Sequence, residues 1–251
     1  MLIDTHCHLD AEEFDSDREQ VISRAREAGV GAFVIPAVER RGFGRVLEIA
    51  AACPDCHPAL GIHPMYVDGA QEADLDALRE RAADCVAIGE IGLDFYVENY
   101  DRERQIHFFE AQLRIAREFD LPVLIHARRA HDAVLSALRR IRVRGGIAHA
   151  FNGSFEQAKE FHKLGFMLGF GGAATYDRAT RIRSLAADLP IGALVLETDA
   201  PDMPPAFVGR ARNSPEYLPG IAKILSGIRG MPESEFAFAT TENARKILEL
   251  E

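Results

Sequence analysis

Six residues whose side chains can bind a metal ion are spread along the sequence, each at or immediately after the end of a short apolar run. They are His6, His8, Glu90, His126, His149 and Asp199. Imidazole nitrogens and carboxylate oxygens form the ligand sets of many catalytic metal ions. If the apolar runs are neighbouring parallel strands, all six side chains converge on one pocket, and the sequence then predicts a catalytic metal centre.

The first two candidate ligands lie one residue apart in the opening segment "IDTHCH". In an extended chain the side chains alternate, so residues two apart point to the same side. His6 and His8 are therefore expected to chelate one ion together. Asp4 has the same parity and lies one step deeper, so we expect it to accept the spare imidazole N–H of a ligand.

Four imidazoles and two carboxylates exceed what one catalytic ion with an open coordination position needs. They suit two ions about 3.5–4 Å apart that share a bridging group. All lysines of the chain fall in helical patterns, so Glu90 is the expected bridge. We expect two divalent ions, and Mg, Mn and Zn all stay open as their identity.

The elements that must position these residues follow from an alternation of apolar runs with amphipathic helical patterns, which is typical of βαβ units and a parallel sheet. A clear helical example is 101–119, where Ile106, Phe109, Leu113 and Ala116 fall on one face. The eight runs read as strands are 2–6, 32–36, 58–62, 86–90, 122–126, 146–150, 166–170 and 194–198.

Eight such units in 251 residues, with no linker between halves, predict a single (β/α)8 TIM barrel over 1–251 with terminal helices. A doubly wound open sheet is the alternative, but a nucleotide-binding sheet of that kind has a Gly-rich first turn, and the first turn here is "THCHLDAEEF".

Two further residues follow predicted strands at the top of such a barrel, where barrel enzymes bind their substrates. His63 follows the strand 58–62, and we expect it to contact the substrate. Arg128 follows His126 by two residues, and its planar guanidinium could bind a substrate phosphate, with a rim salt bridge as the alternative.

The formal net charge of −10 argues against binding nucleic acid along many phosphates, because such binding uses clustered Lys and Arg. The basic run 139–144 precedes a strand and so falls at the bottom of the barrel, away from the pocket. No apolar run has the roughly 18 residues that a membrane span needs, and we expect a cytoplasmic protein without membrane attachment.

The candidate ligands and their surroundings resemble the TatD family of metal-dependent deoxyribonucleases, within the amidohydrolase-like barrel superfamily, and look most like its YjjV-type branch. The resemblance covers nearly the whole chain and runs through "IDTHCHLD", "GIHP", "AIGEIGLDFY", "RQIHFFEAQLRIAREFDLPVLIHARRAHD", "HAFNGS", "GFGGAATYDRA", "LETDAPDMPP", "RNSPEYLP" and "TTENARKIL". It implies metal ligation by the same six residues. Asn213, in "RNSPEYLP", is a further expected substrate contact.

Together these features predict a hydrolase that cleaves phosphodiester bonds, trimming DNA from an end by means of a water held between two divalent ions. His6, His8 and Asp199 would hold one ion, His126 and His149 the other, and Glu90 both. Asp199 is also expected to take the proton of the nucleophile.

The expected substrates are DNA ends or short single strands, and no obligatory protein partner is expected. The alternative is an amide or ester hydrolase, such as a D-aminoacyl-tRNA deacylase, with the same binuclear site. A non-enzymatic barrel that binds metal or a partner protein is a third reading, which the complete ligand set disfavours.

Overall fold

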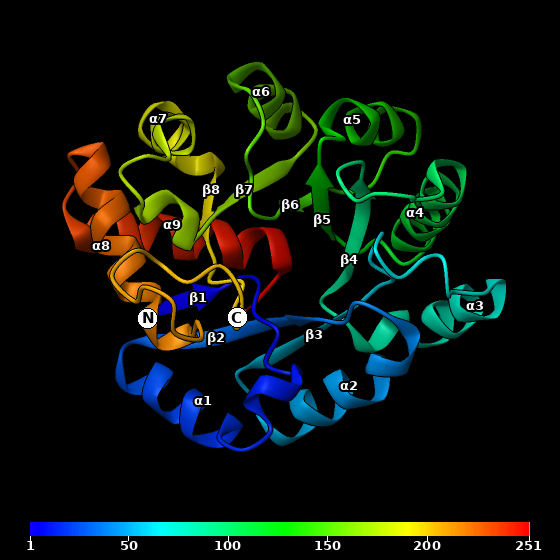
Figure 1. The fold of residues 1–251 in the computed structure, drawn as a ribbon, viewed down its shortest axis with the longest axis horizontal. Coiled ribbons are helices and arrows are strands. Elements are labelled where there is room, and N and C mark those ends of the chain that lie inside the picture. Colours follow the sequence, from blue (N-terminus) through cyan, green and yellow to red (C-terminus); the bar gives the residue numbers. More distant parts are fainter. Residues whose placement is uncertain (251) are drawn as a thin grey trace.

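The computed structural model of the protein describes residues 1–250 and contains eight parallel strands that pair in chain order, β1 to β8 (Figure 1). The strands are β1 (Leu2–Asp4), β2 (Val30–Pro36), β3 (Cys56–Leu60), β4 (Ala87–Asp94), β5 (Val123–Arg128), β6 (Gly146–Ala148), β7 (Phe166–Phe170) and β8 (Leu194–Leu196). The last strand returns to the first, because the backbone N–H of Thr5 donates to the carbonyl of Leu196 at 3.0 Å. This order confirms the predicted barrel and excludes the doubly wound sheet.

Helices α1 to α8 lie around the strands (Figure 1). They are α1 (Arg18–Glu27), α2 (Phe43–Ala52), α3 (Glu72–Arg81), α4 (Arg102–Glu118), α5 (His131–Arg140), α6 (Phe155–Lys163), α7 (Thr180–Asp188) and α8 (Leu218–Arg229). The predicted apolar face of α4 lies against the sheet, with Phe109, Leu113 and Ala116 buried and Ile106 partly buried against the same core.

Helix α4 also carries two buried glutamines, and these attach it to the strands. Gln105 accepts the backbone N–H of Asp94 at 2.9 Å and donates to its carbonyl at 3.1 Å. Gln112 forms the same pair of bonds with Ile62. Both amides satisfy backbone groups that would otherwise be buried without a partner, and they fix the upper ends of β3 and β4.

The last helix, α9 (Glu233–Leu248), crosses the opening of the barrel opposite the candidate site, and Figure 1 shows it in red across the centre. Its residues Ala244, Ile247 and Leu248 pack against the inward-facing side chains of the strands. Those side chains are Ile3, Val34, Ala59, Ala87, Leu124, Ile147 and Val195. The interior is therefore a packed apolar core closed at the bottom.

Several strands end at other positions than the apolar runs predicted. β1, β6 and β8 stop before their candidate ligands, and Ala150 and Asp199 then adopt left-handed backbone conformations, with φ of 43° and 58°. β4 instead continues past Glu90 to Asp94, with an irregular register against β5 between Ile88 and Ile91. Bulges of this kind re-aim side chains, and Glu90 lies within a strand rather than at its end.

The basic segment 139–144 lies at the end of α5, as expected for the bottom of the barrel. Three of its four arginines pair with acidic side chains: Arg139 with Glu160, Arg140 with Glu110, and Arg144 with Glu249. These groups are thus occupied away from the candidate site. No helix in residues 1–250 combines the length and apolar character that crossing a membrane requires.

Candidate metal centre

Glu90 lies at the centre of the candidate site, almost fully buried on β4. Its Oε2 is 3.2 Å from Nε2 of His6 and 3.8 Å from Nε2 of His8. Its other oxygen, Oε1, is 3.1 Å from Nδ1 of His126 and 3.9 Å from Nε2 of His149. One carboxylate therefore faces two sets of imidazoles with two different oxygens.

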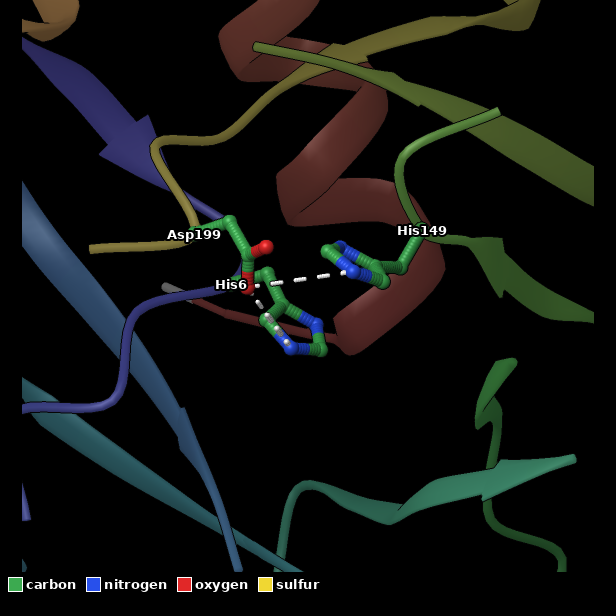
Figure 2. A group of neighbouring side chains, drawn as sticks. All are labelled: His6, His149 and Asp199. Carbon is green, nitrogen blue, oxygen red and sulfur yellow. Dashed lines mark ion pairs between the residues drawn. The ribbon is translucent and has the colours of Figure 1, made fainter. Parts of the chain in front are cut away.

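Asp199 lies beside His6 and His8, the two histidines of the first segment. Its Oδ1 lies 3.8 Å from Nε2 of His6, 3.6 Å from Nε2 of His8 and 3.8 Å from Nε2 of His149. Figure 2 shows this carboxylate facing the rings of His6 and His149, which stack with their centroids 3.7 Å apart. The backbone N–H of Asp199 donates to the carbonyl of His6 at 2.9 Å, and this bond fixes the two segments together.

The structure brings together all six predicted ligands and adds His63. This residue was expected to contact the substrate, but it is buried with its Nε2 3.5 Å from Oε1 of Glu90. Three groups of potential ligand atoms in residues 1–250 each lie within 4.8 Å of one another: His6, His149 and Asp199; His6, His8 and Glu90; and His63, Glu90 and His126.

These side chains are suited to a divalent cation, as three observations indicate. The donors are imidazoles and carboxylates only. The Nε2 atoms of His6 and His8 face each other at 3.3 Å, as two nitrogens that share an ion would. The buried Nδ1 of His6 has no hydrogen-bond partner among the described residues, so the polar contacts of this ring are made by Nε2, which faces Glu90, His8 and Asp199.

The charges of the site favour ionised carboxylates. Burial would raise the pKa of Glu90, but the neighbouring imidazoles, His63 foremost, hold that pKa well below its usual value. The pKa of Asp199 is also lowered despite burial, chiefly by His149. Against the effect of burial, the adjacent carboxylates raise the pKa of His8 to about 9 and that of His149 to about 10. Without a cation, protons on the imidazoles balance the carboxylates.

Two further carboxylates lie next to His126 and His149, each at the ring nitrogen that does not face Glu90. The sequence did not predict either of them. Oδ2 of Asp94 lies 3.2 Å from Nε2 of His126. Oε1 of Glu197 lies 3.2 Å from Nδ1 of His149 and accepts the backbone N–H of Ala150 at 2.6 Å. Such outer partners fix the orientation of a ligating ring and increase its basicity.

A sequence signal for both residues existed. Asp94 has the same parity as Glu90 in "GEIGLD", but the predicted strand 86–90 stops short of it. Glu197 is an acidic residue inside the apolar run "LVLET", a placement that is costly unless the carboxylate has a partner.

Asp4 does not contact an imidazole N–H, and that expectation was wrong. Its carboxylate accepts the backbone N–H of Thr198 at 2.9 Å and the hydroxyl of Thr198 at 2.5 Å. The backbone N–H of His6 donates to it at 3.4 Å. The return of β8 to β1 brings Thr198 against Asp4, so this carboxylate joins the first and last strands of the barrel.

The remaining predicted substrate contacts occupy different surroundings. Arg128 is exposed at the rim, with its guanidinium 3.7 Å from the ring centre of Tyr96, and no carboxylate of residues 1–250 lies within ion-pair distance. Asn213 is fully buried, and its amide donates to the carbonyls of Thr198 and Asp202 at 2.8 and 2.7 Å. The side chain lies inside the loop that follows β8, whereas the sequence analysis expected it to contact the substrate.

Comparison with known proteins identifies the family of the chain. The family described as TatD related DNase matches residues 3–249. The uncharacterized metal-dependent hydrolase YjjV of Escherichia coli (strain K12) is 42% identical over 247 residues, covering 96% of this chain and 95% of that protein. The protein named 3'-5' ssDNA/RNA exonuclease TatD of Erwinia tasmaniensis is 35% identical, covering 99% and 100% of the two chains.

A solved structure agrees as well. The crystal structure of YjjV, a TatD homolog from Escherichia coli K12, superposes with a TM-score of 0.96 at 39% sequence identity, covering 100% of this chain and 98% of that one. The family match, the relatives and the solved structure agree, and the chain belongs to the TatD family of metal-dependent hydrolases.

Proposed function

We propose that the protein hydrolyses phosphodiester bonds at the ends of short single-stranded nucleic acids, with two divalent ions as cofactors. The observation that carries the proposal is the position of Glu90, whose two oxygens face different histidines, His6 through Oε2 and His126 through Oε1. A carboxylate that spans two ions is the arrangement of two-metal hydrolases.

In this proposal His6, His8 and Asp199 hold one ion, His126 and His149 hold the other, and Glu90 contributes to both. Bound divalent ions would lower the pKa of a coordinated water and offset the negative charge of a phosphodiester. Asp199 is ionised at neutral pH, because its pKa is held low, and it is placed to accept a proton from the attacking water.

The rest of the chain supports a substrate bound locally rather than a long duplex. The net charge of −10 argues against binding along many phosphates, whereas the exposed guanidinium of Arg128 forms no ion pair among residues 1–250 and lies at the rim. Relatives such as the Erwinia tasmaniensis protein carry the name 3'-5' ssDNA/RNA exonuclease. The imidazole-rich site suits manganese or zinc, whereas phosphodiester chemistry is also compatible with magnesium.

The test compares the purified protein, loaded in turn with Mg, Mn or Zn, on short single-stranded DNA labelled at either end. His126→Ala and Glu90→Gln should each reduce kcat/KM by about 10³-fold or more, with circular dichroism unchanged, because each removes a proposed ligand. Glu98→Gln, an exposed acidic residue outside the site, is the matched control. Full activity in both ligand variants, or a preference for acyl esters over oligonucleotides, would overturn the proposal.

A further inference from the structure

Two cysteines lie at the ends of a tight turn between α2 and β3. They are Cys53 and Cys56 of the segment "CPDC", and both are free thiols. The backbone N–H of Cys56 donates to the carbonyl of Cys53 at 2.9 Å. A turn closed by this bond keeps its first and last Cα atoms within about 7 Å, a separation that a disulfide can bridge. The fold therefore holds the two side chains ready for oxidation to a disulfide.

A guanidinium lies beside the first of these thiols. Nη2 of Arg26 is 3.1 Å from Sγ of Cys53, and Nε of the same side chain is 2.7 Å from Oδ2 of Asp55. The ion pair with Asp55 holds the guanidinium against the turn, where it can stabilise negative charge on the sulfur of Cys53. Burial raises the pKa of the Cys56 thiol, and the neighbouring Cys53 raises it further, so Cys56 keeps its proton at neutral pH. The surroundings thus favour Cys53 as the attacking sulfur and Cys56 as the sulfur that reacts second.

A hollow of about 650 Å³ between α1 and α2 leads to Cys53, which is one of its lining residues. This volume is in the range of small-molecule sites, about 300–1,000 Å³. Its lining carries the cations Arg18 and Arg26 and several carboxylates, among them Glu19 and Glu48. A small peptide that bears both ammonium and carboxylate groups matches this mixture of charges. The hollow therefore suits a peptide disulfide as the reaction partner of Cys53.

The turn is far from the proposed ligands along the barrel axis. Its residues Pro54 and Asp55 line a second hollow together with Arg245 of α9, the helix that closes the barrel opposite the candidate metal centre. The two cysteines thus form a separate site at the bottom of the barrel.

We propose that Cys53 and Cys56 form a site of reversible thiol–disulfide exchange with small peptide disulfides. Cys53 loses its proton to solvent, and its thiolate attacks one sulfur of the incoming disulfide, which forms a mixed disulfide and expels the other sulfur as a thiolate. The expelled thiolate takes the proton of Cys56. The sulfur of Cys56 then attacks that of Cys53 and expels the second small thiolate, which takes a proton from solvent. One small disulfide is reduced to two thiols while the two cysteines are oxidised to one internal disulfide, and an excess of small thiol reverses the reaction.

The experiment treats the folded protein with oxidised glutathione, blocks the remaining thiols with a maleimide in denaturant, and locates the blocked cysteines by mass spectrometry of peptides. In the wild type, Cys53 and Cys56 should escape the maleimide until a reductant is added, whereas Cys7 and Cys85, which lie apart from this turn, should be blocked. The result does not depend on hydrolase activity, so it is independent of the proposed function. Maleimide on all four cysteines, or glutathione on Cys53 without an internal disulfide, would overturn the proposal.

Three variants test the order of the two steps. Cys56→Ser should stop at the mixed disulfide and carry one glutathione on Cys53, and Cys85→Ser, the change of a buried cysteine elsewhere, should form the internal disulfide at the wild-type rate. Arg26→Gln should slow the reaction about tenfold, because a charge about 3 Å from the sulfur is lost. Failure of Cys56→Ser to take up glutathione on Cys53 would contradict the assigned order, and an unchanged rate in Arg26→Gln would contradict the role of the guanidinium.

Discussion

Glu197 and His149 form a buried pair, with Oε1 of the carboxylate 3.2 Å from Nδ1 of the imidazole. The opposite nitrogen of the ring, Nε2, faces Asp199. The carboxylate thus lies on the Nδ1 side of the ring, opposite the nitrogen that faces the candidate metal centre.

Replacing Glu197 with Gln should weaken metal affinity by about 10- to 100-fold while the barrel stays folded, because the amide can still accept the N–H of Ala150 but no longer increases the basicity of His149. Metal titration with elemental analysis after dialysis measures the effect. Glu156→Gln, on the exposed face of α6, is the matched control. Unchanged affinity in Glu197→Gln would remove the orienting role.

Metal binding should release protons at neutral pH. His8 and His149, with pKa values of about 9 and 10 in the metal-free protein, are protonated at pH 7 and must lose their protons to bind a cation. Apparent metal affinity should therefore fall as the pH is lowered and rise as the pH is raised toward 9. Calorimetric titrations in buffers of different ionisation enthalpy count the protons, and a buffer-independent enthalpy would contradict the prediction.

His131 should make the fold sensitive to acid. Burial against Phe151 and Phe161 lowers its pKa to about 4 from the usual histidine value of 6.5, so the folded state binds fewer protons than the unfolded chain between those pH values. The free energy of unfolding should fall by up to about 3 kcal/mol as the pH drops from 6.5 to 4.

Replacing His131 with Phe should remove this part of the pH dependence, which urea unfolding at pH 4, 5, 6 and 7 measures. The difference between the two proteins isolates His131 from the carboxylates that titrate in the same range. Parallel curves for wild type and His131→Phe would show that the ring is not the acid-sensitive group.

Asn213 should contribute to stability through the loop that follows β8. Replacing it with Ala leaves the buried carbonyl of Thr198 and the part-buried carbonyl of Asp202 without their donor, and loss of the partner of a buried group costs about 1–3 kcal/mol. Thermal unfolding measures this change, with Gln20→Ala on the exposed surface of α1 as the control. If Asn213→Ala kept its Tm and lost only substrate affinity, the expectation from sequence would be right after all.

The barrel and the positions of its proposed ligands were predictable because both depend on local patterns. Apolar runs alternate with helical patterns, and the parity of His6 and His8 places both side chains on one side. The structure confirms the barrel and brings the six side chains together.

The remaining features depend on contacts between distant segments. The partner of Asp4 is Thr198, 194 residues away, and parity within one strand cannot identify it. The extension of β4 to Asp94 depends on its pairing with β5, and the burial of Asn213 depends on how the loop after β8 folds back. Such pairings are set by the closed barrel rather than by the local sequence.

The seam between β8 and β1 has a consequence for biosynthesis. As the nascent chain leaves the ribosome, Asp4 and His6 emerge early, but their partners Thr198 and Asp199 emerge only near the end. Until then β1 has an open edge, and the cation-binding cluster lacks one of its carboxylates. A polypeptide interrupted before β8 would therefore lack Asp199, and the group of His6, His149 and Asp199 could not form.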